Sequence, residues 1–340
     1  RLPLADLPEG VNRRALTIEM RAGALHVFLP PLQQEPWLAL IGHIADTLRE
    51  TQLGAPVLAG YVPGDAAGRW TKLGIASDPG VLEINLPPCA DWRAYAGWLD
   101  TLECAGAAVG LRSFKQTSPE EQTGTGGGNH LVLGGATPTD SPFLRRPDLL
   151  RSFISYWVNH PSLSYLFSGL FVGPTSQAPR IDEARHDTLD EIEVAFAQLD
   201  QWASNPPPWL VDRLFRNILT DVTGNTHRTE MCIDKMYSPD SSTGRLGLLE
   251  LRAFEMPPDA RMSCAQQLLV RSLVASFWNE PYRQKLVRWG TSLNDKFMLP
   301  HFVGQDFDDI LADISHAGFK MDRSWFTPHF EFRFPIYGRA

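Results

Sequence analysis

Strand-like and helix-like segments follow one another unevenly along this 340-residue chain, and their order limits the folds open to it. Strand-like runs are LTIEMRA, ALHVFLPP, GVLEINLPP, HLVLGG, TEMCIDKMY, GLLELRAFEMPP and HFEFRFPIY. Apolar residues at helical spacing predict helices over 36–51, 91–109, 146–158, 188–200, 208–221, 260–279 and 306–318. Because the two kinds of segment do not alternate strictly, a doubly wound parallel sheet is not favoured. We expect an α+β fold in which helices pack on one face of an antiparallel sheet.

The composition excludes several classes of partner. A net charge of −8 gives no basic surface for nucleic acid or an anionic membrane. No apolar run approaches the roughly 18 residues that a membrane-spanning helix needs. The cysteines are widely spaced, which is typical of free thiols in a reducing compartment: Cys89, Cys104, Cys232 and Cys264. We therefore expect a cytoplasmic protein that binds neither nucleic acid nor membrane.

A repeated pair of polar residues occurs in the strand-like runs. The four copies are Glu19-Met20-Arg21, Glu83-Ile84-Asn85, Glu250-Leu251-Arg252 and Glu331-Phe332-Arg333. Residues two apart on a strand point to the same face, so each strand presents both polar side chains together. A solvated face with surface salt bridges explains one such strand. Four copies favour a sheet face that binds a metal–nucleotide complex, because carboxylates are ligands for Mg²⁺ or Mn²⁺ and the guanidinium group matches phosphate.

The run TGTGGGNHLVLGG, residues 123–135, is rich in glycine but fits neither common phosphate-binding loop. No Lys-Ser or Lys-Thr pair follows, and the segment after Gly128 is typical of a strand rather than a helix. Glycine permits close approach of the backbone to a ligand. We expect the run to deliver Asn129 and His130 to a site, although a core histidine and a turn asparagine are the alternatives.

Longer stretches resemble a bacterial amidoligase family whose members usually follow a transglutaminase-like domain in a longer polypeptide. The similar stretches are TGTGGGNHLVLGGATPTDSPFLRRPDLLRSFISYWVNHPSLSYLFSGLFVGPTSQAPRIDEARHD, GLLELRAFEMPP, MLPHF and HFEFRFPIYG. Shorter motifs, namely GTGGGNH, GPTSQAPR and LLELRAFE, resemble glutamine synthetases and glutamate–cysteine ligases. The resemblance implies that the sheet is curved and that one amidoligase-like domain spans residues 1–340. It also implies a transglutaminase-like domain in the same polypeptide, and the start at Arg1 agrees with excision from a longer protein.

The resemblance assigns roles to individual residues. It makes Glu83, His130 and Glu250 candidate metal ligands. The early strand of synthetases carries two carboxylates, but here it contains only Glu19, so Glu230, Asp234 or Glu255 could supply a further ligand. The implied catalytic residues are Arg180 for the substrate carboxylate, Arg252 for phosphate, and Glu255. Nucleotide contacts are expected from Arg252, Asn129, Arg145, Arg146 and Arg333.

The implied reaction joins a small-molecule or peptide carboxylate to an amine. ATP would activate the carboxylate as an acyl phosphate with the help of Mg²⁺ or Mn²⁺. Two alternatives stay open: a phosphotransferase similar to guanidino kinases, and a catalytically inactive interaction domain of a transglutaminase-linked protein.

One thiol lies between carboxylates in the run TEMCIDKMY. Alternation predicts Glu230, Cys232 and Asp234 on one strand face. This spacing does not match a recognised zinc motif, so we interpret Cys232 as structural.

Overall fold

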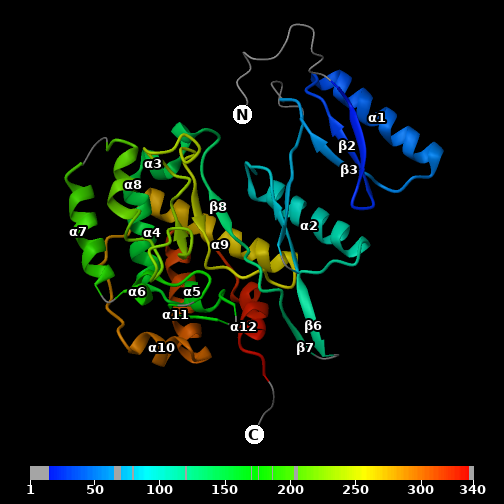
Figure 1. Cartoon of the computed structure of the whole chain (residues 1–340). Coiled ribbons are helices and arrows are strands. Elements are labelled where there is room, and N and C mark those ends of the chain that lie inside the picture. The colour runs from blue at the N-terminus through cyan, green and yellow to red at the C-terminus, as the bar shows by residue number, and fades with distance from the viewer. Residues whose placement is uncertain are drawn as a thin grey trace. The chain divides into compact units, whose positions relative to one another are not determined.

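The computed structural model describes residues 15–64, 70–78, 80–118, 121–169, 171–174, 176–185, 187–202 and 206–336. Its contacts divide the chain into two compact units, Arg1–Leu73 and Gly74–Ala340 (Figure 1). Each unit is described by itself. The expectation of a single domain over residues 1–340 stays a prediction.

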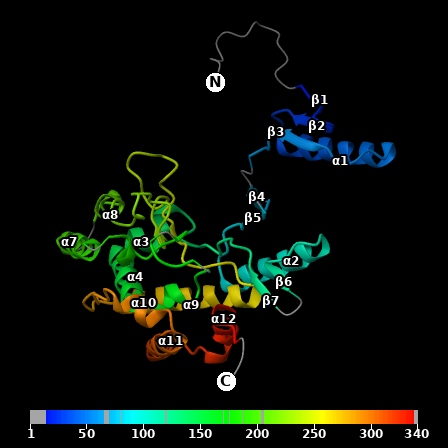
Figure 2. The same cartoon turned by 60° about the horizontal axis from the view of Figure 1, so that its bottom comes forward.

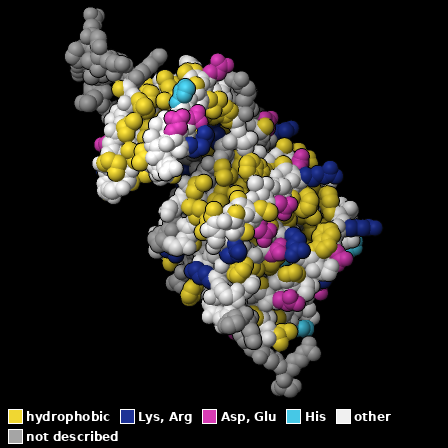
Figure 3. All heavy atoms as spheres, turned by 90° about the vertical axis from the view of Figure 1, so that its right-hand side faces the viewer, with side chains coloured by type: hydrophobic (Ala, Val, Ile, Leu, Met, Phe, Trp, Pro, Cys, Tyr) yellow, Lys and Arg dark blue, Asp and Glu magenta, His cyan; other side chains and the backbone are white. Residues whose placement is uncertain are grey.

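The first unit is a three-stranded sheet with one helix. Strands β1 (Thr17–Arg21) and β2 (Ala24–Leu29) are antiparallel, and α1 (Gln34–Thr51) connects β2 to the parallel strand β3 (Val57–Gly60). Positive φ at both residues of the Ala22-Gly23 turn allows the two-residue hairpin. Many large apolar side chains of this unit are exposed, as the upper part of Figure 3 shows.

Long helices build the core of the second unit. They are α2 (Trp92–Ala108), α4 (Pro147–Asn159), α9 (Ala260–Asn279) and α11 (Pro300–His316). Figure 2 shows α9 crossing the middle of the unit, and it contacts α2, α4 and α11. Helix α4 is buried on almost every side. Helices α4, α9 and α11 share one apolar cluster with the central strands, so the site lies on a rigid support.

Aspartate caps and an early proline explain where three of these helices begin. The side chain of Asp91 accepts a hydrogen bond from the backbone of Ala94 at the start of α2, and Asp259 does the same for Arg261 at α9. Pro147 occupies the first turn of α4, as the sequence predicts.

The central sheet of the second unit has three short strands. Strand β10 (Leu249–Leu251) lies between β8 (Leu131–Leu133) and β9 (Met231–Cys232), and both pairings are antiparallel. Leu249 and Leu251 are fully buried in the apolar cluster, whereas Glu250 points to the other face. The predicted alternation of core and polar side chains in this strand is confirmed.

Shorter elements complete the second unit. Two antiparallel hairpins precede the central sheet: β4 (Gly74–Asp78) with β5 (Val81–Asn85), and β6 (Phe114–Ser118) with β7 (Glu121–Gly124). The remaining helices are α3 (Pro142–Arg145), α5 (Ser162–Tyr165), α6 (Ile181–Ala184), α7 (Thr188–Asp200), α8 (Trp209–Phe215), α10 (Ser292–Phe297) and α12 (Thr327–Arg333).

The mixed α+β class is confirmed, but the strands do not build one continuous sheet. The described strands form four separate small sheets, and the β2–β3 pair is parallel. The central strands are only two or three residues long. Gly134 directly follows β8 and Gly247 lies two residues before β10, and glycine at these positions limits further pairing because it favours turns and bulges.

The strand predicted for HFEFRFPIY is wrong, because residues 327–333 form helix α12. Phe326, His329, Phe330 and Arg333 follow the helical spacing of three and four residues. Packing of Phe330 and Phe326 against Phe307 selects the helix over the strand preference of the aromatic residues. The pair Glu331–Arg333 is therefore not part of a sheet face. Helix α8 also ends at Phe215, six residues earlier than predicted.

Within the described residues, no helix combines the length and apolar character needed to cross a membrane.

Candidate functional site

A cavity of about 380 Å³ lies in the second unit. Three segments far apart in the sequence line it: the glycine-rich run 123–128, the loop from Gly173 to Arg180, and residues 252–255 after β10. Residues 164–169 around the end of α5 form a further part of its wall. The motifs that suggested an active site in the sequence therefore meet around one cavity.

Backbone hydrogen bonds join the glycine-rich run to the strand after β10. The amide of Asn129 donates to the carbonyl of Phe254 over 2.8 Å, and the amide of Met256 donates to the carbonyl of Gly127 over 2.9 Å. Glu230 connects the segment after β10 to the loop that ends at Arg180. Its carbonyl accepts from the amide of Arg252 over 2.8 Å, and its amide donates to Pro179 over 3.3 Å. Main-chain pairing thus fixes the relative positions of all three lining segments.

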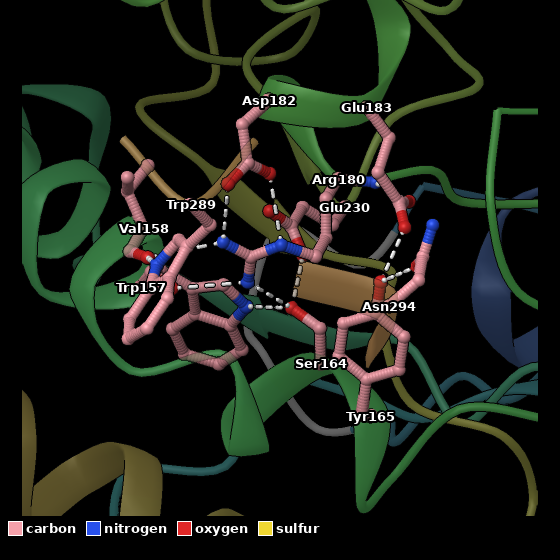
Figure 4. A network of polar contacts seen from close by, with 10 residues as sticks. All are labelled: Trp157, Val158, Ser164, Tyr165, Arg180, Asp182, Glu183, Glu230, Trp289 and Asn294. Atoms are coloured by element: carbon pink, nitrogen blue, oxygen red, sulfur yellow. Dashed lines mark hydrogen bonds and ion pairs between the residues drawn. The ribbon is translucent and has the colours of Figure 1, made fainter. Parts of the chain in front are cut away.

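Arg180 lies at the centre of a buried polar network behind this wall (Figure 4). Its guanidinium forms a two-pronged ion pair with Asp182, with both N–O distances at 2.9 Å. The other three N–H groups donate to the carbonyls of Trp157 and Val158 and to the hydroxyl of Ser164. All five guanidinium hydrogens are therefore used. The geometry gives Arg180 a structural role at the end of α4, without a free donor for the predicted substrate carboxylate.

The Ser164 hydroxyl is also saturated. It donates to Oε2 of Glu230 over 2.6 Å and accepts from the Arg180 guanidinium and the Trp157 indole. One donor and two acceptor positions are all that a hydroxyl has. Ser164 is consequently a structural link rather than a nucleophile.

Glu230 is fully buried, and its Oε1 has no hydrogen-bond partner among the described residues. Burial raises the pKa of its carboxyl to about 7, against the opposing influence of the Arg180 charge and the Ser164 hydrogen bond. The predicted metal ligand Glu230 therefore belongs to the network behind the cavity wall.

Sequence reasoning did not single out the neighbouring pair of Tyr165 and Glu183. The Tyr165 hydroxyl donates to Oε1 of Glu183 over 2.5 Å, and Oε2 of Glu183 accepts from the backbone of Arg180. Burial raises the pKa of both side chains. The three-residue spacing of Arg180 and Glu183 at the start of α6 matches a capping arrangement, which is the one available sequence signal.

Glu250 is surrounded by Arg252, Lys235 and His130 on the polar face of the central sheet. Its Oε1 lies 2.6 Å from Nη1 of Arg252 and 3.3 Å from Nδ1 of His130, and its Oε2 lies 3.3 Å from Nζ of Lys235. Burial opposes ionisation, but the hydrogen bond with His130 and the charges of Arg252 and Lys235 lower the pKa of Glu250 to about 2. The structure thus brings together the predicted residues His130, Glu250 and Arg252.

Glu255 faces the cavity from the end of the same segment. Its carboxylate forms no hydrogen bond with the residues that the structure describes, and burial raises its pKa against the opposing charge of Arg333. A Cβ atom at Gly124 would overlap this carboxylate, and one at Gly169 would approach it to 3.2 Å. A Cβ atom at Gly128 would overlap the ring of His130. The glycines therefore make room for two candidate site residues.

Three predicted nucleotide contacts lie away from the cavity lining. Asn129 is buried, and its amide nitrogen donates to Ser263 and Gln266 on α9. Arg146 forms a two-pronged pair with Asp148 at the start of α4, and Arg145 lies over the ring of Trp278. The geometry gives Asn129 and Arg146 local structural contacts.

Arg333, at the last position of α12, donates to the carbonyl of Tyr165. Burial lowers the pKa of its guanidinium, and the charge of Glu255 opposes that shift. Arg333 is thus close enough to influence Glu255 electrostatically, although it is not part of the lining.

The other two predicted metal ligands are exposed. Oε1 of Glu83 on β5 accepts a 2.8 Å hydrogen bond from Asn85, while Val81 on the same strand face approaches Gly127. Glu19 lies opposite His26 in the first unit. Neither belongs to the group of potential metal-binding atoms formed by His227, Cys232 and Glu250, a combination that sequence spacing did not reveal.

The sequence was compared with known proteins. Residues 5–340 match the family described as "Putative amidoligase enzyme (DUF2126)". The chain belongs to this family. The assignment confirms the predicted amidoligase resemblance and classes the chain with ligase enzymes. In this amidoligase, the match includes both compact units and every segment that lines the cavity. No curated protein and no solved structure matches the chain.

We predict that Arg180→Lys destabilises the fold. An ammonium has three donors in place of five, so at least two buried acceptors lose their partner, at about 1–3 kcal/mol each. The free energy of unfolding in urea should fall by about 2–6 kcal/mol. Arg213→Lys is the control, because its pair with Asp240 is exposed. It should cost under about 1 kcal/mol, and equal losses in the two variants would contradict the structural role of Arg180.

The raised pKa of Glu230 predicts a pH-dependent contribution to stability. Its folded pKa of about 7 lies above the ordinary glutamate pKa of 4.5, so the contribution is present below pH 4.5 and is lost as the pH rises through 7. Glu230→Gln removes this ionisation. The free energy of unfolding of the wild type, relative to the variant, should therefore decrease by about 3 kcal/mol between pH 4.5 and pH 8. A difference that stays constant over this pH range would show that Glu230 does not retain its proton.

Proposed function

We propose that the cavity is the active site of a ligase that joins a small-molecule or peptide carboxylate to an amine and consumes ATP with Mg²⁺ or Mn²⁺. The observation that carries the proposal is the meeting of the three motif segments around one cavity, where Nε of Arg252 has no described partner and the Glu255 carboxylate forms no described hydrogen bond. An acyl phosphate is the intermediate that fits an amidoligase of this kind. The glutamine synthetase type of sheet remains part of the proposal, with the polar face of β10 as its floor.

Arg252 is the better candidate for binding a phosphate or carboxylate than Arg180. All the donors of Arg180 are satisfied within the protein, whereas Nε of Arg252 is buried without a hydrogen-bond partner in the described part of the chain. A planar guanidinium can bind two oxygens of one anion. We therefore assign orientation of the transferred phosphate to Arg252.

His130 and Glu250 are suitable ligands for a divalent cation. Glu250 is ionised at neutral pH because its pKa is about 2, and His130 lies within 3.3 Å of it. Carboxylate oxygen is the ligand type that Mg²⁺ prefers, and Mn²⁺ accepts imidazole as well. A bound ion would neutralise the charge that develops on the phosphate oxygens. Glu83 and Glu19 remain candidates for additional ligands.

Binding of a metal ion to Glu250 would also break the ion pair between Glu250 and Arg252. Nη1 of Arg252 lies 2.6 Å from Oε1 of Glu250, so a cation bound there would repel the guanidinium. Arg252 is then available for the phosphate oxygens, so metal binding and anion binding would favour each other.

Glu255 is suited to accept the proton of the attacking amine. Its carboxylate faces the cavity, has no described partner, and has a raised pKa because of burial. A carboxylate with a raised pKa is a stronger base than an exposed one. It could bind the amine as an ammonium ion, take one proton from it, and leave the neutral amine to displace phosphate from the acyl group.

Product analysis tests this proposal. Purified protein would be incubated with ATP, Mg²⁺ and a panel of amino acids and dipeptides, each offered as acid and as amine. A ligase forms equal amounts of ADP, free phosphate and amide, whereas a phosphotransferase forms ADP and a phosphorylated product without amide. We expect Glu255→Gln to lower turnover by about 100-fold or more while the exposed control Glu280→Gln leaves it unchanged. Full activity of Glu255→Gln would overturn the role of Glu255, and absence of all products would favour an inactive interaction domain.

The glycine-rich run generates a separate prediction. Gly124→Ala should displace the carboxylate of Glu255 and lower turnover, with little change in melting temperature because the carboxylate is the end of a flexible side chain. Gly127→Ala is the matched control, since the nearest atoms to its Cβ would be the Thr125 hydroxyl at 3.3 Å and Val81 at 3.5 Å. Similar activity of the two variants would show that the position of Glu255 does not depend on Gly124.

A further inference from the structure

A second group of possible metal ligands lies beside the cavity. One ligand atom from each of His227, Cys232 and Glu250 falls within 4.8 Å of the other two. Cys232 and Glu250 are direct partners on the antiparallel strands β9 and β10, so the sheet holds both side chains on the same face. His227 comes from the preceding turn, with Nδ1 at 3.8 Å from Sγ of Cys232.

The surroundings add a carboxylate next to His227, outside the 4.8 Å group, and an entry path. Oδ2 of Asp234 lies 3.6 Å from Nδ1 of His227, and a hydroxyl, that of Thr226, donates to the same carboxylate oxygen. About half of the His227 side chain is exposed, whereas Cys232 is buried. An ion could therefore enter past the imidazole and reach the thiol.

The arrangement does not suit a cysteine nucleophile. A catalytic histidine uses one ring nitrogen for the thiol and the other for its orienting carboxylate. Here Cys232 and Asp234 approach the same nitrogen of His227, and Nε2 lies 3.3 Å from the Arg252 guanidinium. The buried thiol also has no direct access to the cavity, since Cys232 is not among the lining residues.

We propose that His227, Cys232 and Glu250, with Asp234 as a further ligand, bind a transition-metal ion of the Zn²⁺ class. Sulfur, imidazole and carboxylate together are typical of zinc coordination. The thiol distinguishes this site from one for Mg²⁺, which prefers a shell of oxygen atoms. Binding replaces the proton of the Cys232 thiol, which is released to solvent, by the metal ion.

Two neighbouring cations compete with the ion for Glu250. Arg252 and Lys235 lie 2.6 Å and 3.3 Å from its carboxylate oxygens. Removal of the partly exposed Lys235 charge should therefore strengthen metal binding. This gain of affinity is specific to a site that includes Glu250.

The proposal shares Glu250 with the proposed ligase site but does not depend on ligase activity. Binding can be measured without ATP and without substrates. Failure of the ligase assay would leave this site untouched, and failure of metal binding would leave the ligase assay unaffected.

Titration of the whole chain with Co²⁺, under reducing conditions, tests the proposal. A cobalt–thiolate bond produces a charge-transfer absorption band, which Cys232→Ser should abolish. Affinity should fall about tenfold or more in His227→Ala and rise in Lys235→Met. Zn²⁺ should remove the band by displacement.

Cys104→Ser is the matched control, because Cys104 is an exposed free thiol. The band should persist in this variant. Loss of the band in Cys104→Ser, its persistence in Cys232→Ser, or unchanged affinity in Lys235→Met would each overturn the proposed ligand set. Circular dichroism of every variant establishes that a lost band does not reflect an unfolded protein.

Discussion

The buried guanidinium of Arg180 is the interaction on which the cavity depends. It connects the last carbonyls of α4, the Ser164 hydroxyl and the Asp182 carboxylate. Ser164 extends the connection to Glu230, whose main chain joins Pro179 to Arg252. The side chains of this network are largely buried, so a lost partner leaves an unpaired polar atom in the interior. The cost of that loss holds the loop before α6 and the strand after β10 in fixed positions.

The polar groups in front of this network are less completely satisfied. Arg252 has a buried nitrogen without a described partner, and the Glu255 carboxylate faces the cavity without a hydrogen bond from the described residues. The charges of Arg252 and Lys235 and a hydrogen bond with His130 keep Glu250 ionised although it is buried. A divalent ion must compete with those side chains, and its binding would release them. Arg180, at the centre of the network, has all its hydrogen bonds satisfied and supports the cavity wall. Arg252 and Glu255, which line the cavity, keep atoms free to bind a ligand.

The main helices could be predicted because each carries its own apolar spacing and start signals, such as Pro147 in α4 and Asp259 before α9. The strands were harder because sheet pairing depends on distant partners. HFEFRFPIY alternates like a strand but forms α12, where Phe330 packs against Phe307. Part of the site followed from motif resemblance: His130, Glu250 and Arg252 do lie together. Glu83 and Glu19 lie outside that group, since the described strands form separate sheets.

By itself, the sequence determined the mixed α+β class, the amidoligase family and the polar face of β10, because these depend on local spacing and on motifs read in order. Tertiary structure alone decided the role of each charged side chain. Two arginines, Arg180 and Arg252, look equivalent in sequence. Arg180 donates all five guanidinium hydrogens to acceptors within the protein, whereas Nε of Arg252 has no partner among the described residues. Likewise, His227 and Cys232 meet Glu250 only through strand pairing. Burial and the supply of nearby partners fix such roles, and neither is a local property of the chain.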